Sequence, residues 1–174
     1  MPVTLIKALG LAGALAGLGF CAVCQAHEVK TRGLLLHHPW VHAAAAGAMG
    51  TDGFVIITNT GKAPERFLGA TIEGAVDATL VRAVSPVDAN ALCRLENGID
   101  IAPGATLVLK PGASGLLFGA VNKSLREDIY ANGTLVFARA GVVKIEFYIQ
   151  AEDSKAAKHS PAGAMAACLA SATQ

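Results

Sequence analysis

Short apolar segments separated by turn-forming residues run through most of the chain, and they constrain its fold more than any other feature. The clearest is VVKIEFYI at residues 142–149, in which Val143, Ile145 and Phe147 alternate with Lys, Glu and Tyr. A period of two is that of a strand with one face in the core, so we expect these three side chains to be buried. No stretch of residues 33–149 has a convincing helical period of 3.6 residues.

Eight further segments have the length and composition of strands. GFVIITN at 53–59 is rich in β-branched and aromatic residues, and GLLFGAV at 115–121 is a continuous apolar run typical of a strand buried on both faces. We interpret Asn132-Gly133 and Ala140-Gly141 as connections that precede the last two strands. Many short strands predict an all-β fold, an antiparallel Greek-key sandwich or barrel. The expected strands are 33–38, 53–59, 66–72, 79–84, 91–95, 106–109, 115–121, 134–138 and 142–149.

Composition excludes several classes of protein. Hydrophobic residue types make up 53% of the chain and charged types 16%, with a formal net charge of +1. This apolar content argues against disorder. The balanced charge argues against nucleic acid as a partner, because binding to a phosphate backbone needs clustered Lys and Arg. The sequence motifs of serine hydrolases, zinc proteases and phosphate-binding loops do not occur, so we do not expect an enzyme.

The N-terminal segment has the pattern of a secretory signal peptide. Lys7 precedes an apolar run at residues 8–23, and the small residue Ala26 closes the segment. The run is short for a membrane span, which needs about 20 residues; an uncleaved membrane anchor is the alternative. Lipidation at Cys21 is disfavoured because a phenylalanine precedes it. We expect cleavage after Ala26 and export to the periplasm.

Cleavage at this place divides the chain into a signal peptide (1–26), a domain (27–150) and a C-terminal tail (151–174). The tail is rich in Ala and Ser, and we expect it to be flexible. The mature chain would keep two cysteines, Cys93 and Cys168, which can pair in an oxidising compartment. The pairing stays open at this point because Cys168 lies in the tail.

Five short motifs follow one another in the expected domain. Their order and spacing resemble the periplasmic copper chaperones called PCu(A)C, and the resemblance covers residues 27–149. It implies a cupredoxin-like β-sandwich that helps to deliver Cu(I) to the copper centre of cytochrome oxidase, with oxidase-assembly factors as partners. The motifs are HPW at 38–40, TNTG at 58–61, RFLGA at 66–70, GIDIAPG at 98–104 and LKPG at 109–112.

The resemblance also implies a copper site, and this chain departs from it. The family binds Cu(I) through His and Met, soft ligands that suit a soft ion. Residues 50–164 contain no methionine and residues 43–158 no histidine. We therefore expect a degenerate metal site with an apolar patch in its place, in which Cys93 alone keeps a ligand atom. The alternative for Cys93 is a small buried hydrophobe. The corresponding positions are Val81, Ala83, Cys93, Gly115 and Leu117.

Histidines supply the other metal candidates. His27 would be the first residue of the mature chain, where its α-amine and imidazole could chelate one copper ion; the alternative is an unstructured terminal residue. His37, His38 and His42 lie close together in the sequence, but neighbours on a strand point to opposite faces. We expect these three residues and Trp40 to have packing roles.

Two functions of different classes remain. The first is a periplasmic copper-chaperone-like protein with a degenerate site, for which Cu(I) would be held by Cys93 or His27. The second is an interaction module on the same β-sandwich that binds no metal. Either would bind a periplasmic protein partner and have no membrane span after the signal peptide is removed.

Overall fold

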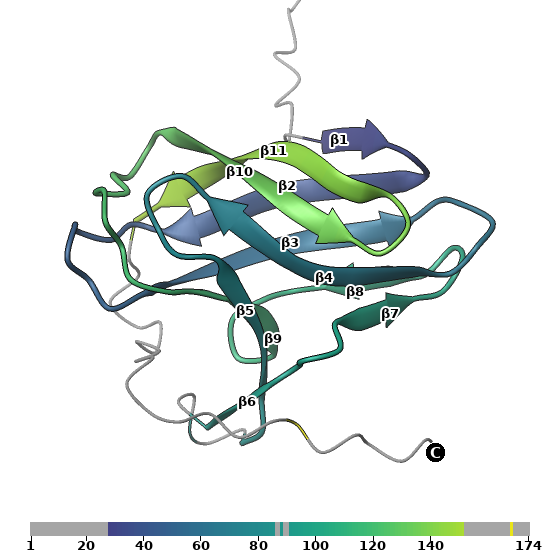
Figure 1. Ribbon diagram of the computed structural model, residues 1–174, viewed down its shortest axis with the longest axis horizontal. Coiled ribbons are helices and arrows are strands. Elements are labelled where there is room, and N and C mark those ends of the chain that lie inside the picture. Colours follow the sequence, from purple (N-terminus) through teal and green to yellow (C-terminus); the bar gives the residue numbers. More distant parts are fainter. Residues whose placement is uncertain (1–27, 86–87, 89–90, 152–167, 169–174) are drawn as a thin grey trace, which may run out of the picture.

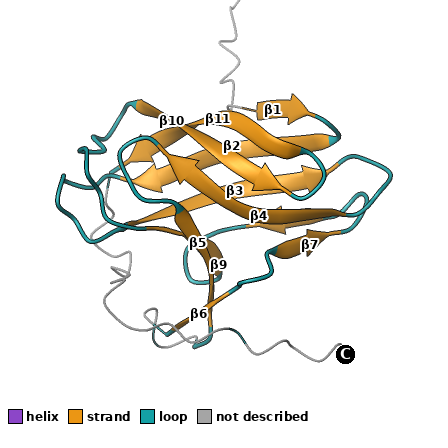
Figure 2. Cartoon of the chain, viewed as in Figure 1, coloured by secondary structure: helices purple, strands orange, loops and turns teal. Residues whose placement is uncertain are grey.

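The computed structural model describes residues 28–85, 88, 91–151 and 168, and within them it contains strands and loops but no helix (Figure 2). The chain forms one sheet that curls on itself (Figure 1). Its strands are β1 (Glu28–Thr31), β2 (Leu34–His42), β3 (Thr51–Asn59), β4 (Glu65–Ile72), β5 (Ala78–Ala83), β6 (Leu92–Arg94), β7 (Ile99–Ile101), β8 (Thr106–Val108), β9 (Ser114–Phe118), β10 (Tyr130–Phe137) and β11 (Gly141–Gln150).

The strand order along the sheet is β6-β5-β9-β3-β2-β11-β10-β4-β7, with β1 added to β2 and β8 added to β3. All strand pairs are antiparallel except β2 with β11, which are parallel. β4 also contacts β5 and β9, although these strands are far from it in the sheet order. These contacts curl the sheet into a half-barrel and confirm the predicted all-β, cupredoxin-like fold.

Each expected strand is present, with changes at the ends, and two strands were missed. β1 has four residues and β7 has three, so neither is long enough to show a clear alternation. The interpretation of Asn132-Gly133 as a connection is wrong, because both residues lie inside β10. A Cβ atom on Gly133 would lie 2.5 Å from the carbonyl oxygen of Thr71 and 2.8 Å from the Phe147 ring. Glycine therefore allows a close approach here and does not make a turn.

The core lies inside the curl of the sheet. Val143 and Ile145 are each 6% exposed and Phe147 is fully buried, which confirms the face predicted for the last strand. The Phe147 ring meets the ring of Phe118 edge to face, with centroids 5.7 Å apart. Most of the remaining core consists of Leu, Ile and Val side chains.

β2 changes its neighbour halfway along its length. Its first half pairs with β1 and its second half with β11, and its register against β3 shifts between His37 and Trp40. At this irregularity His38 has a φ of 45°, a left-handed conformation that is uncommon outside glycine. Among the described residues, no helix has the length and apolar character needed to cross a membrane.

Candidate functional site

Strands β5 and β9 carry the positions at which the sequence comparison expects a copper site. Val81 lies opposite Gly115, and Thr79 lies opposite Leu117. Residues opposite one another in an antiparallel pair point to the same face, and so do alternate residues of one strand. Val81, Ala83, Gly115 and Leu117 therefore share one face, which we call the β5–β9 face.

Cys93 is not on the β5–β9 face. On β6 it lies opposite Arg82, whereas its neighbour Arg94 lies opposite Val81. Because successive residues of a strand alternate between faces, Cys93 points away from the side to which Val81 points. The structure thus brings four of the five expected positions together and separates the one that has a ligand atom.

Apolar packing closes the β5–β9 face. Val81 is 3% and Leu117 4% exposed. The ring of Phe54, on β3, lies over Gly115: a Cβ atom at Gly115 would be 3.1 Å from its Cε1 atom. The Trp40 ring packs against the Phe54 ring, with the two centroids 4.6 Å apart. None of these four side chains has a metal-binding atom, so these four positions do not fit Cu(I).

Cys93 is bound to Cys168 in a disulfide. The two Cα atoms are 4.8 Å apart, within the normal range for the bond. The N–H of Cys168 also donates a hydrogen bond of 2.8 Å to the carbonyl oxygen of Arg94, so this residue of the tail is held against β6. A metal ligand must be a thiolate, so the proposal that Cys93 binds Cu(I) applies to the reduced protein only.

The histidines do not gather around a common point. His37 Nδ1 lies 3.4 Å from a carboxylate oxygen of Glu28, and His38 Nε2 lies 3.0 Å from Nε2 of Gln150. His42 packs edge to face against Trp40, at a centroid distance of 4.9 Å. No group of three or more His, Cys, Asp or Glu side chains that could hold a metal ion occurs in the described residues. His27 lies outside them.

Sequence reasoning missed a buried polar network at the opposite end of the sheet. Asn59 is 2% and Glu65 7% exposed. Asn59 Nδ2 donates to the carbonyl oxygens of Ala63 and Ile101, both at 2.9 Å, and its Oδ1 accepts from the N–H of Gly61 at 3.0 Å. The β3–β4 loop is therefore fixed by one side chain, which belongs to the TNTG motif.

Glu65 fixes a second turn by the same means. Its carboxylate accepts hydrogen bonds from the N–H groups of Arg66 at 2.8 Å and of Arg139 and Ala140 at 2.9 Å each. Burial acts to raise the pKa of this carboxyl, but the three N–H donors and the charge of Arg139 outweigh it and hold the pKa below its ordinary value of 4.5. One sequence signal could have identified this residue: Glu65 lies two positions before the buried Phe67, so a period of two turns its side chain inward.

These bonds join three turns into one unit, which we call the three-turn end. It consists of Arg32-Gly33 between β1 and β2, residues 60–64 between β3 and β4, and residues 138–140 between β10 and β11. The carbonyl oxygen of Gly33 accepts from Thr60 N–H at 2.8 Å and Gly61 N–H at 3.0 Å. A hollow of about 300 Å³ lies between the turns.

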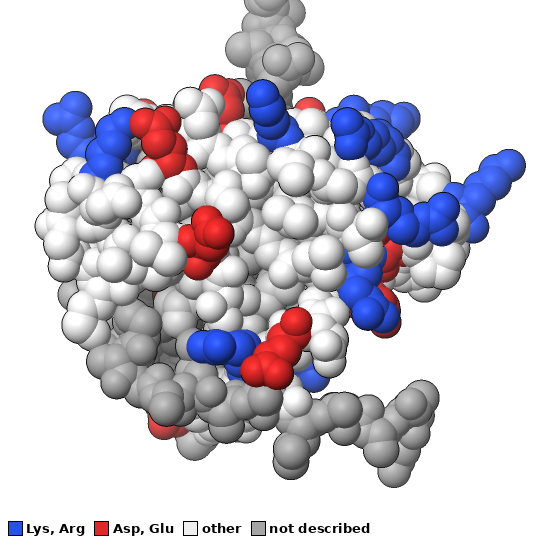
Figure 3. Space-filling model, in the orientation of Figure 1, with Lys and Arg blue, Asp and Glu red and all other residues white. Residues whose placement is uncertain are grey.

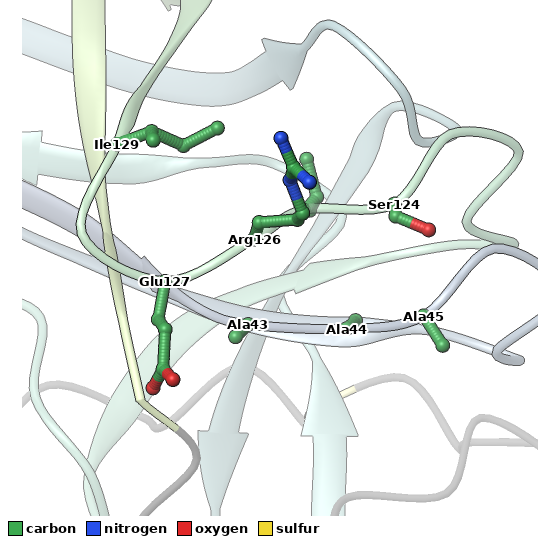
Figure 4. A pocket seen from close by; sticks show the side chains of 8 residues that line it. Ala43, Ala44, Ala45, Ser124, Arg126, Glu127 and Ile129 are labelled. Carbon is green, nitrogen blue, oxygen red and sulfur yellow. The ribbon is translucent and has the colours of Figure 1, made fainter.

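A larger and more open hollow lies between the loops after β2 and before β10. Ala43–Ala45 form one wall of it, and the segment from Ser124 to Ile129 forms the other (Figure 4). The Ala44–Leu125 bridge joins the two loops. Arg126 and Glu127 are the charged groups that line it, and Figure 4 shows their side chains pointing away from each other. The two charged side chains of this hollow therefore do not converge on a common ligand position.

Comparisons with known proteins agree with the fold. The sequence model of one family, described as lipoprotein LpqE-like, matches residues 34–149. The copper-bound PCuAC domain from PmoF2 matches with a TM-score of 0.60 and 24% identity, over 72% of this chain and 99% of that one. The apo PCuAC domain from PmoF1 matches with a TM-score of 0.60 and 28% identity, over 72% and 100%.

A more distant structure has the same architecture. The Cu(I) form of DR1885 from Deinococcus radiodurans matches with a TM-score of 0.53 and 15% identity, over 73% of this chain and 83% of that one. No curated protein matches the chain. The matches below 25% identity concern the fold alone, and it is the fold of domains that bind copper.

Proposed function

The chain belongs to the LpqE-like family and has a PCuAC-type domain, and from this premise we propose that it is an exported protein of the copper-chaperone type that does not hold Cu(I) on its β5–β9 face. It acts instead by binding a periplasmic protein partner through its β-sandwich. On this proposal, any delivery of copper to cytochrome oxidase depends on a partner that carries the ion.

The observation that carries the proposal is the packing of the Phe54 ring over Gly115. The ring occupies the space into which a side chain at position 115 would project. Val81 and Leu117 on the same face are buried and contribute only carbon atoms. Binding Cu(I) there would require both new ligands and the removal of this ring from its place.

Export is part of the proposal. The pattern around Lys7, residues 8–23 and Ala26 supports a signal peptide at residues 1–26, a domain at 27–150 and a tail at 151–174. The disulfide between Cys93 and Cys168 supports an oxidising compartment such as the periplasm. Sequencing the N-terminus of the purified native protein tests the cleavage site, and a chain that begins at Met1 would contradict it.

A second candidate function is favoured by the disulfide itself. Reduction of the Cys93–Cys168 disulfide by a dithiol would produce two thiols that lie side by side, and the dithiol would itself be oxidised to a disulfide. Two thiolates form a site that suits Cu(I). The protein would then be a copper carrier in its reduced state, with ligands unlike those of its family.

Titration with Cu(I) in the presence of a competing chelator separates the two candidates. We expect the oxidised mature protein not to compete at nanomolar affinity, which corresponds to about 12 kcal/mol. If the second candidate is correct, the reduced protein competes, and Cys93→Ser and Cys168→Ser each abolish the competition. Tight Cu(I) binding by the oxidised protein would contradict the proposed function.

Cu(II) provides the control for His27. A chelate of its α-amine and imidazole prefers Cu(II), and acidification weakens it because both nitrogens must be unprotonated. Cu(II) binding that is lost in His27→Ala and persists in Cys93→Ser would place the remaining copper affinity at the N-terminus.

A further inference from the structure

The three-turn end carries a positively charged hollow that the proposed function does not use. Arg32, Lys62 and Arg139 line it, and each comes from a different turn. All three side chains are exposed. Figure 3 shows Lys and Arg side chains concentrated at the right-hand end of the molecule, where Figure 1 places the turns after β1, β3 and β10.

The hollow is built on a rigid base. Asn59 and Glu65 tie the β3–β4 loop and the β10–β11 turn by hydrogen bonds to backbone groups. The Arg32 guanidinium donates to the carbonyl oxygen of Ala140, which joins the β1–β2 turn to the β10–β11 turn. The three turns are thereby held together before any ligand binds, which lowers the entropic cost of binding.

Arg32 occupies a backbone conformation that its residue type disfavours. The two residues Arg32 and Gly33 connect β1 to β2, with φ values of 47° and 77°. A two-residue hairpin turn with both φ values positive normally takes Asn, Asp or Gly at its first position. Backbone strain of this kind occurs most often at functional sites.

The carboxylate below the rim offsets only part of its positive charge. Both oxygens of Glu65 are occupied by backbone N–H donors. Within the described part of the chain, Lys62 makes no ion pair or side-chain hydrogen bond. Three cations above one buried carboxylate leave an excess of positive charge at the mouth of the hollow.

We propose that this hollow binds a phosphate group, which is supplied either as free phosphate or by the headgroup of an anionic phospholipid. A planar carboxylate can be satisfied by one guanidinium. A phosphate offers oxygens in several directions and up to two negative charges, which matches cations that approach from three turns. The proposal does not depend on whether Cu(I) binds at the β5–β9 face.

The test compares Lys62→Ala/Arg139→Ala with Lys110→Ala in the full mature chain. Arg139 contacts Glu65 through its backbone N–H, so the alanine keeps that bond. Lys110 is exposed and does not line the hollow, so it controls for a change in charge. Thermal unfolding of all variants checks that each is folded.

In the first arm, inorganic phosphate is titrated at constant ionic strength while the backbone amides are followed by NMR. We expect saturable shifts at Gly61, Lys62 and Ala140. Loss of a charge-assisted hydrogen bond should weaken binding at least about tenfold in the double variant, and Lys110→Ala should bind about as well as the natural protein. In the second arm, the proteins are sedimented with vesicles of phosphatidylglycerol and phosphatidylcholine, or of phosphatidylcholine alone.

The outcomes of the two arms distinguish free phosphate, a lipid headgroup and no binding. Phosphate-induced shifts without sedimentation identify a free phosphate ligand. Sedimentation with the anionic vesicles that is lost in the double variant and reduced by added phosphate identifies a headgroup. The proposal is overturned if neither arm detects binding, if the double variant binds as well as the natural protein, or if Lys110→Ala weakens binding to the same extent.

Discussion

The β5–β9 face and the three-turn end belong to one sheet but differ in the polarity of the side chains that they bury. At the β5–β9 face, the positions where the family resemblance led us to expect metal ligands carry Val81, Ala83, Gly115 and Leu117, and an aromatic ring lies over Gly115. At the three-turn end, the chain buries Glu65 and satisfies its carboxylate with three backbone donors. The four positions of the first region offer only carbon atoms, whereas the second region keeps a buried charge at a considerable cost in desolvation.

The difference shows that the scaffold and the chemistry of this domain can be separated. The strand order and curl agree with copper-binding domains, yet the side chains that could interact with a charged ligand have a different location. A fold by itself does not establish a function. The predictions below therefore perturb each region in turn and ask whether the two respond as the contrast requires.

The largest effect is expected from Glu65→Ala. It leaves three N–H donors without an acceptor, one of them buried and two partly buried. With about 1–3 kcal/mol for the buried donor and about 1 kcal/mol for each of the others, the free energy of unfolding should fall by about 3–5 kcal/mol. Urea denaturation measures the change. Glu65→Gln is the matched control, because its amide oxygen still accepts a bond, and it should lose less. Equal losses in the two variants would mean that the neutral amide cannot replace the carboxylate, so that the negative charge, and not one acceptor oxygen, fixes this end.

Phe54→Ala should destabilise the other region by about 3 kcal/mol, because it removes a ring that is 3% exposed. It should not create tight Cu(I) binding, since the His42 imidazole that packs against this ring would supply a single ligand. Denaturant unfolding and a chelator competition measure the two properties on one sample. New Cu(I) affinity in this variant would contradict the description of the face as free of ligands.

Acidification should destabilise the three-turn end. Because the pKa of Glu65 is lowered in the folded protein, its contribution to stability is complete above the pKa of the unfolded chain and is lost as the pH falls through the folded value. The unfolding free energy should therefore fall less between about pH 5 and pH 3 in Glu65→Gln than in the natural protein. Glu73, bonded to Lys123, and Asp100, bonded to Arg66, also have lowered pKa values. They are the same in both proteins, so the difference isolates Glu65.

The smallest effect concerns Gly115→Ala. Its Cβ atom would lie 3.1 Å from the Phe54 ring, and overpacking of this kind costs about 1–2 kcal/mol. In the Phe54→Ala background the added methyl group has room, and the substitution should become neutral or stabilising. A double-mutant cycle measures this coupling. Additive effects would show that the ring and the glycine are independent.

The fold was predictable because its main signals are local. Alternation in β11 and the apolar runs of β3 and β9 identify strands from neighbouring residues alone. β1 and β7 were missed because each is short and includes charged residues, whereas the equally short β6 and β8 lie in longer, largely apolar segments. Gly133 was misinterpreted as part of a turn. A glycine is needed there because Phe147 of the adjacent strand approaches closely, and such a contact is not visible in the sequence around position 133.

The sites were harder to predict because they depend on pairing between distant strands. Motif order placed Val81 and Gly115 at corresponding positions, and the strand register brings them opposite each other. The order of the motifs could not show that Cys93 lies on the other face, since the face of Cys93 depends on its pairing with Arg82. The Glu65 network joins residues more than 70 positions apart, and no local pattern indicates its three donors.

The β5–β9 face is tested most directly by locating Cu(I) on the protein. Backbone amide signals of the oxidised mature protein are recorded before and after one equivalent of Cu(I) is added without oxygen. We predict no shift or broadening at Val81, Gly115 and Leu117, because none of these three side chains carries a ligand atom. Changes concentrated at these three residues, and retained in Cys93→Ser and His27→Ala, would show that the face does hold the ion and would contradict the account.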